Sequence, residues 1–254
     1  MNKFIALISF LVITLGGCIT TGDDKPQKWN KAERSELHTQ MGINYYEKGQ
    51  IDVARDEFQL ALDIDQNSAR ANLAMGHLQN RLGDIKKARF HFSRAVKNDS
   101  DNISAMNDYG FFLCKTGETE AGLIQLNKSL NHPLNQVQHF TLYGMGECNR
   151  LAGNTVAATE NYEFAIRLQP TMRRALFELA KLKFEAMEYF KTRGYLERFF
   201  QNRYFTEESL FLAVKNEIEL QRRDIAGDYA KQLRESFPLS EFIAQLRPLF
   251  SSES

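Results

Sequence analysis

The sequence predicts an all-α chain folded as a right-handed superhelix of about six helix–turn–helix repeats. Three observations predict this fold. Small residues recur at a period of about 34 along most of the 254-residue chain. Glycines separate the apolar stretches at the same period, as expected where one helix ends before the next begins. Only five prolines are present, which favours helices because proline breaks helix interiors.

The first element is a short apolar segment at the N-terminus. Met1 to Lys3 form a small basic start, and residues 4–15 form an apolar stretch. That stretch is too short to cross a bilayer core, which needs about 20 residues, and is typical of a secretory signal peptide. Residues 15–18 read Leu-Gly-Gly-Cys and are similar to a bacterial lipobox, in which the cysteine is acylated and becomes the new N-terminus.

We therefore expect a lipoprotein signal peptide over residues 1–17, a lipid on Cys18 and a polar tether over residues 18–30. Two or more acyl chains hold a protein stably on a membrane, because each buried methylene contributes about 0.8 kcal/mol. Ile19 follows the cysteine. In lipoproteins of this type an aspartate at this position is a signal for retention at the inner membrane, so Ile19 implies transport to the outer membrane. The alternative is an ordinary cleaved signal with a chance cysteine.

Five columns of residues set the phase of the repeats that fill residues 31–250. In order along the repeat they are Gly42, Gly76, Gly110 and Gly146; Gly49, Gly83, Gly117 and Gly153; Ala54, Ala88, Gly122 and Ala158; Phe58, Phe92, Leu126 and Tyr162; and Ala61, Ala95, Ser129 and Ala165. The first and third columns let two antiparallel helices approach, and the second ends the first helix. The large residue of the fourth column is expected to fill the gap to the neighbouring pair. This is the tetratricopeptide pattern.

Six tetratricopeptide-like helix pairs follow from these columns. They are placed at 35–68, 69–102, 103–136, 139–172 and 173–206, with a degenerate last pair at 207–238. In the fifth copy Met187 replaces the turn glycine. Terminal copies of stacked arrays are often atypical because they cap the core.

No catalytic, metal or nucleic-acid site is expected. The formal net charge is zero, so no strong basic field attracts nucleic acid. The sequence has no P-loop, GxSxG, HExxH or paired CxxC motif. We therefore expect a non-enzymatic chain with no metal, no small-molecule substrate and no cofactor besides the lipid on Cys18. Cys114 and Cys148 fall within helical apolar patterns; a disulfide is permitted, but two separate small core residues are favoured.

The inner surface of a superhelix of helix pairs is its usual binding face, and the first helix of each pair lines it. Helical spacing turns the same offsets of each repeat inward. The predicted partner-binding groove consists of Arg70, Leu73, His77, Asn107, Phe111, Phe140, Tyr143 and Arg150. Its apolar members would suit a partner helix or an extended peptide. The alternative is that some of these side chains turn into the core between repeats.

Several segments carry a resemblance that goes beyond architecture. They are Tyr109–Gly110 with Phe112–Cys114 and Gly117; Gly146 with Cys148 and Gly153; Leu176–Leu182 with Tyr195–Phe199; and Phe237–Glu241. Together with the lipobox they resemble the type IV pilus biogenesis/stability lipoproteins (PilF/PilW), the pilotins, over essentially the whole mature chain. Arg223–Asp224 stands where that family has a Gly-Asp turn in its last pair.

The resemblance implies a lipid-anchored protein on the periplasmic face of the outer membrane. Its implied partner is the secretin subunit of the type IV pilus, which it would bind and help to assemble into the ring through which the pilus passes. The implied process is pilus (fimbrium) biogenesis and stability. The alternative is a tetratricopeptide lipoprotein scaffold for another envelope machine, such as one serving β-barrel insertion or cell-wall enzymes.

Overall fold

The computed structural model describes residues 29–251, whose regular structure is entirely helical. The signal peptide over 1–17, Cys18 and the tether up to residue 28 lie outside the described residues. The helices are α1 (Lys31–Glu47), α2 (Ile51–Ile64), α3 (Ala69–Arg81), α4 (Ile85–Asn98), α5 (Ile103–Lys115), α6 (Thr119–Leu130), α7 (Gln138–Leu151), α8 (Thr155–Leu168), α9 (Arg173–Glu185), α10 (Tyr189–Phe199), α11 (Glu207–Glu219), α12 (Arg223–Ser236) and α13 (Phe242–Ser251). Within this range no helix combines the length and the apolar character that a bilayer crossing requires.

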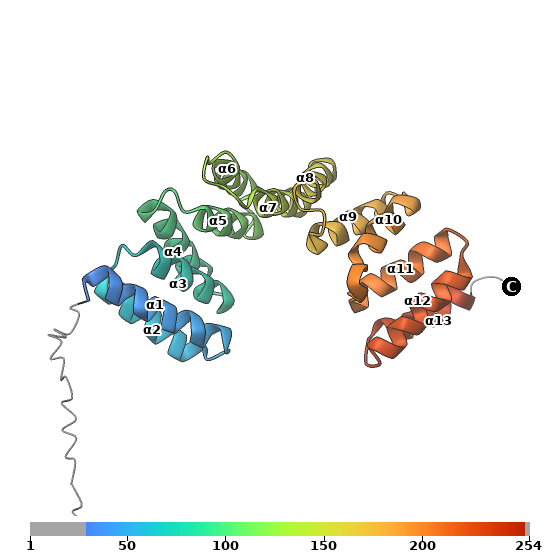
Figure 1. The fold of residues 1–254 in the computed structure, drawn as a ribbon, viewed down its shortest axis with the longest axis horizontal. Coiled ribbons are helices and arrows are strands. Elements are labelled where there is room, and N and C mark those ends of the chain that lie inside the picture. The colour runs from blue at the N-terminus through green and yellow to red at the C-terminus, as the bar shows by residue number, and fades with distance from the viewer. Residues whose placement is uncertain (1–28, 252–254) are drawn as a thin grey trace, which may run out of the picture.

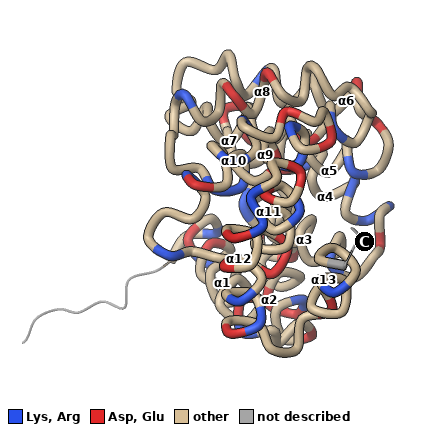
Figure 2. Tube along the Cα trace, turned by 90° about the vertical axis from the view of Figure 1, so that its right-hand side faces the viewer, with Lys and Arg blue, Asp and Glu red and all other residues tan. Residues whose placement is uncertain are grey.

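Successive helix pairs follow one another along an arch (Figure 1). In its middle, α5, α7 and α9 lie on the inner side, and α6 and α8 lie on the outer side. The prediction of an all-helical repeat superhelix is confirmed. Figure 2 shows that basic and acidic residues alternate along the chain, without a large region of one sign.

The turn inside each pair depends on one residue in the left-handed backbone region. Gly49, Gly83, Gly117 and Gly153 have φ between 75° and 89°, which glycine adopts at little cost. The fifth and sixth pairs keep the same turn without glycine, because Met187 (φ 59°) and Gln221 (φ 57°) take its place. These two residues are 34 positions apart, so the repeat period continues through the last pair.

The first-column glycines are where the two helices of a pair meet most closely. A Cβ added to Gly76 would lie 2.8 Å from the ring of Phe92, and one added to Gly110 would lie 2.8 Å from Leu126 Cγ. The large fourth-column residue therefore packs on the glycine of its own pair, in addition to the gap to the next pair that we expected it to fill. It also reaches that neighbour, since the rings of Phe92 and Phe112 are 5.1 Å apart.

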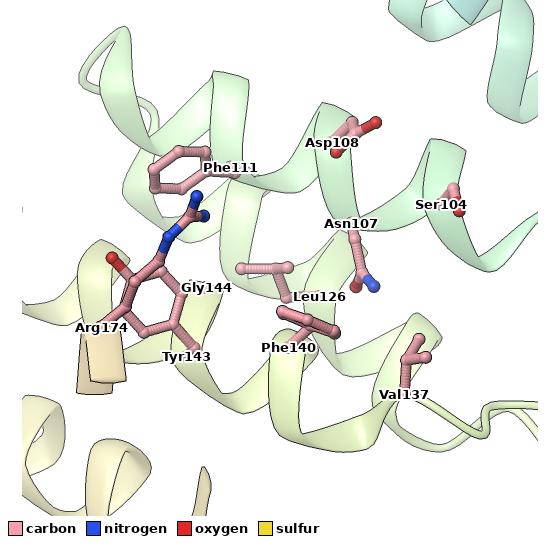
Figure 3. A pocket seen from close by; sticks show the side chains of 10 residues that line it. All are labelled: Ser104, Asn107, Asp108, Phe111, Leu126, Val137, Phe140, Tyr143, Gly144 and Arg174. Atoms are coloured by element: carbon pink, nitrogen blue, oxygen red, sulfur yellow. The ribbon is translucent and has the colours of Figure 1, made fainter. Parts of the chain in front are cut away.

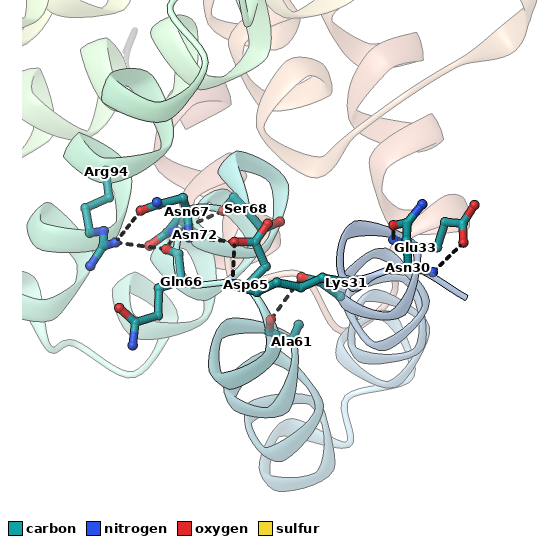
Figure 4. Close-up of polar contacts among 11 residues, drawn as sticks. Asn30, Lys31, Glu33, Ala61, Asp65, Gln66, Asn67, Ser68, Asn72 and Arg94 are labelled. Atoms are coloured by element: carbon teal, nitrogen blue, oxygen red, sulfur yellow. Dashed lines mark hydrogen bonds and ion pairs between the residues drawn. The ribbon is translucent and has the colours of Figure 1, made fainter. Parts of the chain in front are cut away.

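Polar side chains fix the first helix and the first loop between repeats (Figure 4). Asn30 caps α1 in a capping box with Glu33, a signal in the sequence that sets the start of this helix. In the loop after α2, Asn72 Nδ2 donates to the carbonyl oxygens of Gln66 (3.0 Å) and Ser68 (2.8 Å). Arg94 Nη2 also donates to Gln66 O, at 2.9 Å. The second pair thereby satisfies the loop carbonyls of the first.

Cys114 on α5 and Cys148 on α7 are joined by a disulfide, with their Cα atoms 5.2 Å apart. Both side chains are buried, as expected of core residues. The preference for two separate thiols is wrong, because the first helices of the third and fourth repeats lie side by side at this point. Glycine rather than alanine occupies the third column at Gly122, since a Cβ there would collide with the Cys114 sulfur.

A closing helix, α13, follows the last pair and covers its core. Leu246 is completely buried against α11 and α12, in a cluster with Leu210, Val214 and Leu233. Phe211 and Phe242 stack with their ring centroids 4.8 Å apart. The predicted last pair ends at residue 238, and no helix was predicted after it, although apolar residues at 242, 243, 246, 249 and 250 have helical spacing.

Candidate protein-binding grooves

A groove lies between α5 and α7 (Figure 3), two helices that stand on the inner side of the arch near its middle (Figure 1). We call it the central groove; it has a volume of about 420 Å³. Its walls and floor are formed by Ser104, Asn107, Asp108, Phe111, Leu126, Val137, Phe140, Tyr143, Gly144 and Arg174. In Figure 3, Arg174, Phe111 and Tyr143 lie at one end of the groove, and Val137 lies at the other.

Helical spacing explains how these side chains come together. Ser104, Asn107 and Phe111 are separated by three and four residues on α5, so they share one face of that helix. Phe140 and Tyr143 are related in the same way on α7. Gly144 keeps the floor open, because a Cβ at this position would lie 3.3 Å from Leu126 Cδ2. The aromatic rings thus line a depression whose floor is an aliphatic core residue.

The central groove exposes apolar surface to solvent. Phe140 is 52% exposed, although it stands on the same face as the half-buried Tyr143. Phe111 is half-buried, and Lys115 Nζ lies 4.7 Å from the centre of its ring. Burial, assisted by the Glu147 carboxylate, raises the pKa of Tyr143 to about 12, so its hydroxyl remains a hydrogen-bond donor at neutral pH.

Two polar groups of the central groove have unused bonding capacity. Asn107 Oδ1 is buried and has no hydrogen-bond partner within the described part of the chain. Buried polar atoms are nearly always satisfied, so this oxygen is able to accept a hydrogen bond from a bound group. Arg174 is exposed and makes no hydrogen bond or ion pair with any residue between 29 and 251. Its guanidinium is free to meet a carboxylate.

A second groove, the N-terminal groove, has a volume of about 300 Å³ and lies between the first two helix pairs. It is lined by Ile43, Tyr46, Glu47, Phe58, Arg70, Leu73, Ala74 and His77. Unlike Arg174, Arg70 is already engaged, since it pairs with Glu36 and donates to Gln40 Oε1 at 2.7 Å. His77 Nε2 lies 2.8 Å from Asp108 Oδ2, which connects this groove to the wall of the central groove.

Beside the central groove is a set of paired charged and polar groups that we call the ionic ridge: Glu147, Arg150, Tyr162, Glu178 and Lys181. Arg150 lies 3.0 Å from Glu147 and 3.5 Å from Glu178. The Tyr162 hydroxyl donates to Glu147, and burial together with this hydrogen bond raises the pKa of Tyr162 far above its usual value. The hydrogen bond to Glu147 likewise raises the pKa of Arg150. The ridge therefore holds α7, α8 and α9 together.

The structure divides the eight predicted groove residues into three places. Asn107, Phe111, Phe140 and Tyr143 line the central groove, and Arg70, Leu73 and His77 line the N-terminal groove. Arg150 lies in neither groove and belongs to the ionic ridge.

Sequence reasoning did not select Arg174 as a site residue. It occupies the same offset in the fifth repeat as Arg70 and Ser104 in the second and third, so the rule that selected Arg70 would have found it. Among the described residues no cluster of three or more His, Cys, Asp or Glu side chains could hold a metal ion. The grooves offer apolar walls, hydrogen-bonding groups and one free cation, which suits the binding of a polypeptide segment.

Comparison with known sequences identifies similar proteins. Residues 69–102 match the tetratricopeptide repeat family. The type IV pilus assembly protein PilF of Pseudomonas aeruginosa is 28% identical over 235 residues, which cover 92% of this chain and 93% of PilF. The human tetratricopeptide repeat protein 6 is 23% identical over 166 residues, but these cover only 31% of that protein.

Solved structures show the same arrangement of helices. The structure of Pseudomonas aeruginosa PilF superposes with a TM-score of 0.75 at 25% identity and covers 86% of this chain and 98% of PilF. PilW, described as a widely conserved type IV pilus biogenesis factor, superposes with a TM-score of 0.77 at 23% identity. That alignment covers 84% of this chain and 97% of PilW, and at this identity it establishes the fold alone.

Proposed function

This chain is a PilF-like tetratricopeptide repeat protein, and on that premise we propose that it serves type IV pilus biogenesis as a protein-binding assembly factor. The observation that carries the proposal is the similarity to PilF over nearly the full length of both sequences. The human tetratricopeptide repeat protein 6 matches over only 31% of its own length, as expected when only the repeat is shared.

In this proposal the protein is a pilotin for the secretin of the type IV pilus. Lipid on Cys18 attaches the chain to the periplasmic face of the outer membrane, as the lipobox-like tetrapeptide suggests. The grooves on the inner side of the arch bind a segment of the secretin subunit. The tether keeps that subunit near the bilayer and raises its effective concentration for ring assembly. Neither a cofactor nor a small-molecule substrate takes part.

Deletion of the gene tests the role in secretin assembly. We expect heat-resistant secretin multimers to fall and pilus-dependent motility to be lost, and the full-length chain to restore both. Normal multimers in the deletion strain would overturn the pilotin role. They would favour the scaffold alternative if another envelope complex were lost instead.

A Cys18→Ala variant tests the anchor separately. We expect a folded protein that no longer fractionates with the outer membrane, because the acyl chains supply the attachment. Far-UV circular dichroism serves as the control for folding. Unchanged fractionation of the Cys18→Ala variant would contradict the anchor.

A further inference from the structure

A third groove, which we call the C-terminal groove, lies on α9, α11 and α13 and has a volume of about 280 Å³. It is lined by Phe177, Lys181, Glu208, Phe211, Leu212, Lys215 and Phe242. Lys215 makes no ion pair within residues 29–251, and its Nζ lies 4.8 Å from the Phe184 ring and 5.9 Å from the Phe211 ring. Like the central groove, this one combines aromatic walls with a cation that no carboxylate neutralises.

Helix α9 connects the central and C-terminal grooves. Arg174 lines the first, and Phe177 and Lys181 line the second. These residues are spaced by three and four positions, so they follow one face of the helix. The ionic ridge occupies the same face between them, because Glu178 pairs with both Arg150 and Lys181. The inner side therefore presents an apolar groove, the partly exposed Arg150 and Lys181 of the ionic ridge, and a second apolar groove in succession.

The unpaired charges of the two grooves favour acidic ligand groups. Arg174 and Lys215 have no ion-pair partner in the described structure, whereas Asp108 in the central groove is engaged by His77 at 2.8 Å. Glu208, at the rim of the C-terminal groove, is the acidic group that faces a ligand there. A carboxylate beside each apolar anchor would therefore find a cation in each groove.

The spacing of the helices sets the length of a ligand that reaches both grooves. The central groove lies between α5 and α7, and the C-terminal groove lies between α9 and α11. Two steps between neighbouring inner helices separate them by about 20 Å, since each step is at or somewhat beyond the 8–10 Å of closely packed helices. An extended polypeptide rises about 3.3 Å per residue, so about six residues span that distance.

We infer that the central and C-terminal grooves together hold one extended acidic segment of a partner polypeptide. Its two large apolar side chains, about six residues apart, fill the two grooves. A carboxylate next to each of them pairs with Arg174 or Lys215, and a polar stretch between them crosses the ionic ridge. This inference rests on the proposed function in one respect, namely that the inner side of the arch binds a polypeptide.

A peptide array tests both the spacing and the charge. The probes are peptides of glycine and serine with two phenylalanines separated by two to ten residues, each followed by Glu, Gln or Lys. The full-length chain, purified in detergent, is expected to bind best at a spacing of about six with Glu. Equal binding of the Glu and Lys series, or no dependence on spacing, would overturn the inference.

Alanine variants of the two unpaired cations test whether each of them binds a carboxylate of the peptide. Arg174→Ala and Lys215→Ala should each weaken the Glu peptide roughly two- to fivefold, as expected of partly exposed ion pairs, and should leave the Gln peptide unchanged. Arg34→Ala, at an exposed arginine on α1 outside the three grooves, is the matched control and should change neither. If Arg174→Ala and Lys215→Ala weakened the Glu and Gln peptides equally, the assigned ion pairs would be wrong.

The outcome is separable from that of the deletion experiment. Selective binding of acidic two-anchor peptides combined with normal secretin multimers in the deletion strain would reject the pilus role and support the inference. Loss of multimers combined with no peptide selectivity would support the pilus role and reject the inference.

Discussion

Replacing Gly122 by alanine tests the packing argument at its tightest point. The Cβ of this alanine would lie 2.6 Å from Gly110 O and 3.0 Å from Cys114 N, and would also collide with the Cys114 sulfur. Two of these atoms belong to the backbone and the third to a disulfide, so none can move away easily. The first, second and fourth repeats have alanine in this column and the fifth has threonine, and in none of them does a cysteine stand at the position of Cys114.

The expected loss of stability is the difference between two opposing contributions to the free energy of unfolding. Overpacking a close-packed core costs about 1–3 kcal/mol, and the upper part of that range, about 2–3 kcal/mol, applies here because the colliding atoms cannot move away easily. Alanine in a helix interior is about 1 kcal/mol more favourable than glycine, which offsets part of that cost. We expect Gly122→Ala to lower the free energy of unfolding by about 1–2 kcal/mol. For a chain of this size the thermal midpoint should then fall by about 2–8 °C.

Gly194→Ala is the matched control, because Gly194 also lies in the second helix of a pair but has no atom within 4 Å of the added Cβ. Only the helix-propensity gain remains there, so we expect a stabilisation of about 0.5–1 kcal/mol. Thermal unfolding of the full-length chain, followed by far-UV circular dichroism, measures both variants. The packing argument is refuted if Gly122→Ala unfolds at or above the wild-type midpoint.

Three further predictions concern the groove, the disulfide and pH. Phe111→Ala should weaken partner binding and leave the thermal midpoint nearly unchanged. Phe112 is the buried neighbour, and Phe112→Ala should lower the free energy of unfolding by about 3–5 kcal/mol. Equal destabilisation of the two variants would place Phe111 in the core. Reduction of the Cys114–Cys148 disulfide, which spans 34 residues, should cost about 4 kcal/mol, and a melting curve unaffected by reductant would contradict this. Burial and nearby cations lower the pKa of His91 to about 4, so the unfolded chain takes up a proton below pH 6.5 that the folded chain does not. Stability should therefore fall between pH 6.5 and 4, and melting curves should show a smaller fall for His91→Gln.

The repeat architecture could be predicted because its signal lies in small residues at fixed positions. The contact between two helices and the turn both favour a glycine, so these positions can be recognised in the sequence whatever residues pack around them. The resemblance to PilF and PilW is confirmed by the comparisons over nearly the whole chain. The last pair was harder to place, because Met187 and Gln221 take the left-handed turn position that glycine marks in the first four repeats.

The grooves could be predicted only in part. Offset rules select the side chains that point inward, but not which neighbours leave a cavity between them. Phe111 and Tyr143 share a groove because Gly144 and Leu126 shape its floor, and this depends on packing between α6 and α7. Arg150 obeys the same offset rule, yet Glu147 and Glu178 hold it in the ionic ridge. For a similar reason, the sequence could not decide whether Cys114 and Cys148 form a disulfide, because it does not give the distance between α5 and α7.

Site-specific photo-crosslinking in cells tests the central claim most directly. A photoreactive phenylalanine analogue would replace Phe140, which is 52% exposed in the central groove, or Phe164, which is 50% exposed on α8 outside the three grooves. The two positions match in residue type and exposure and differ in the face they occupy. We predict that the secretin subunit is captured from position 140 and not from position 164. Capture from position 164 alone, or none from position 140 while secretin assembly is normal, would contradict binding on the inner side of the arch.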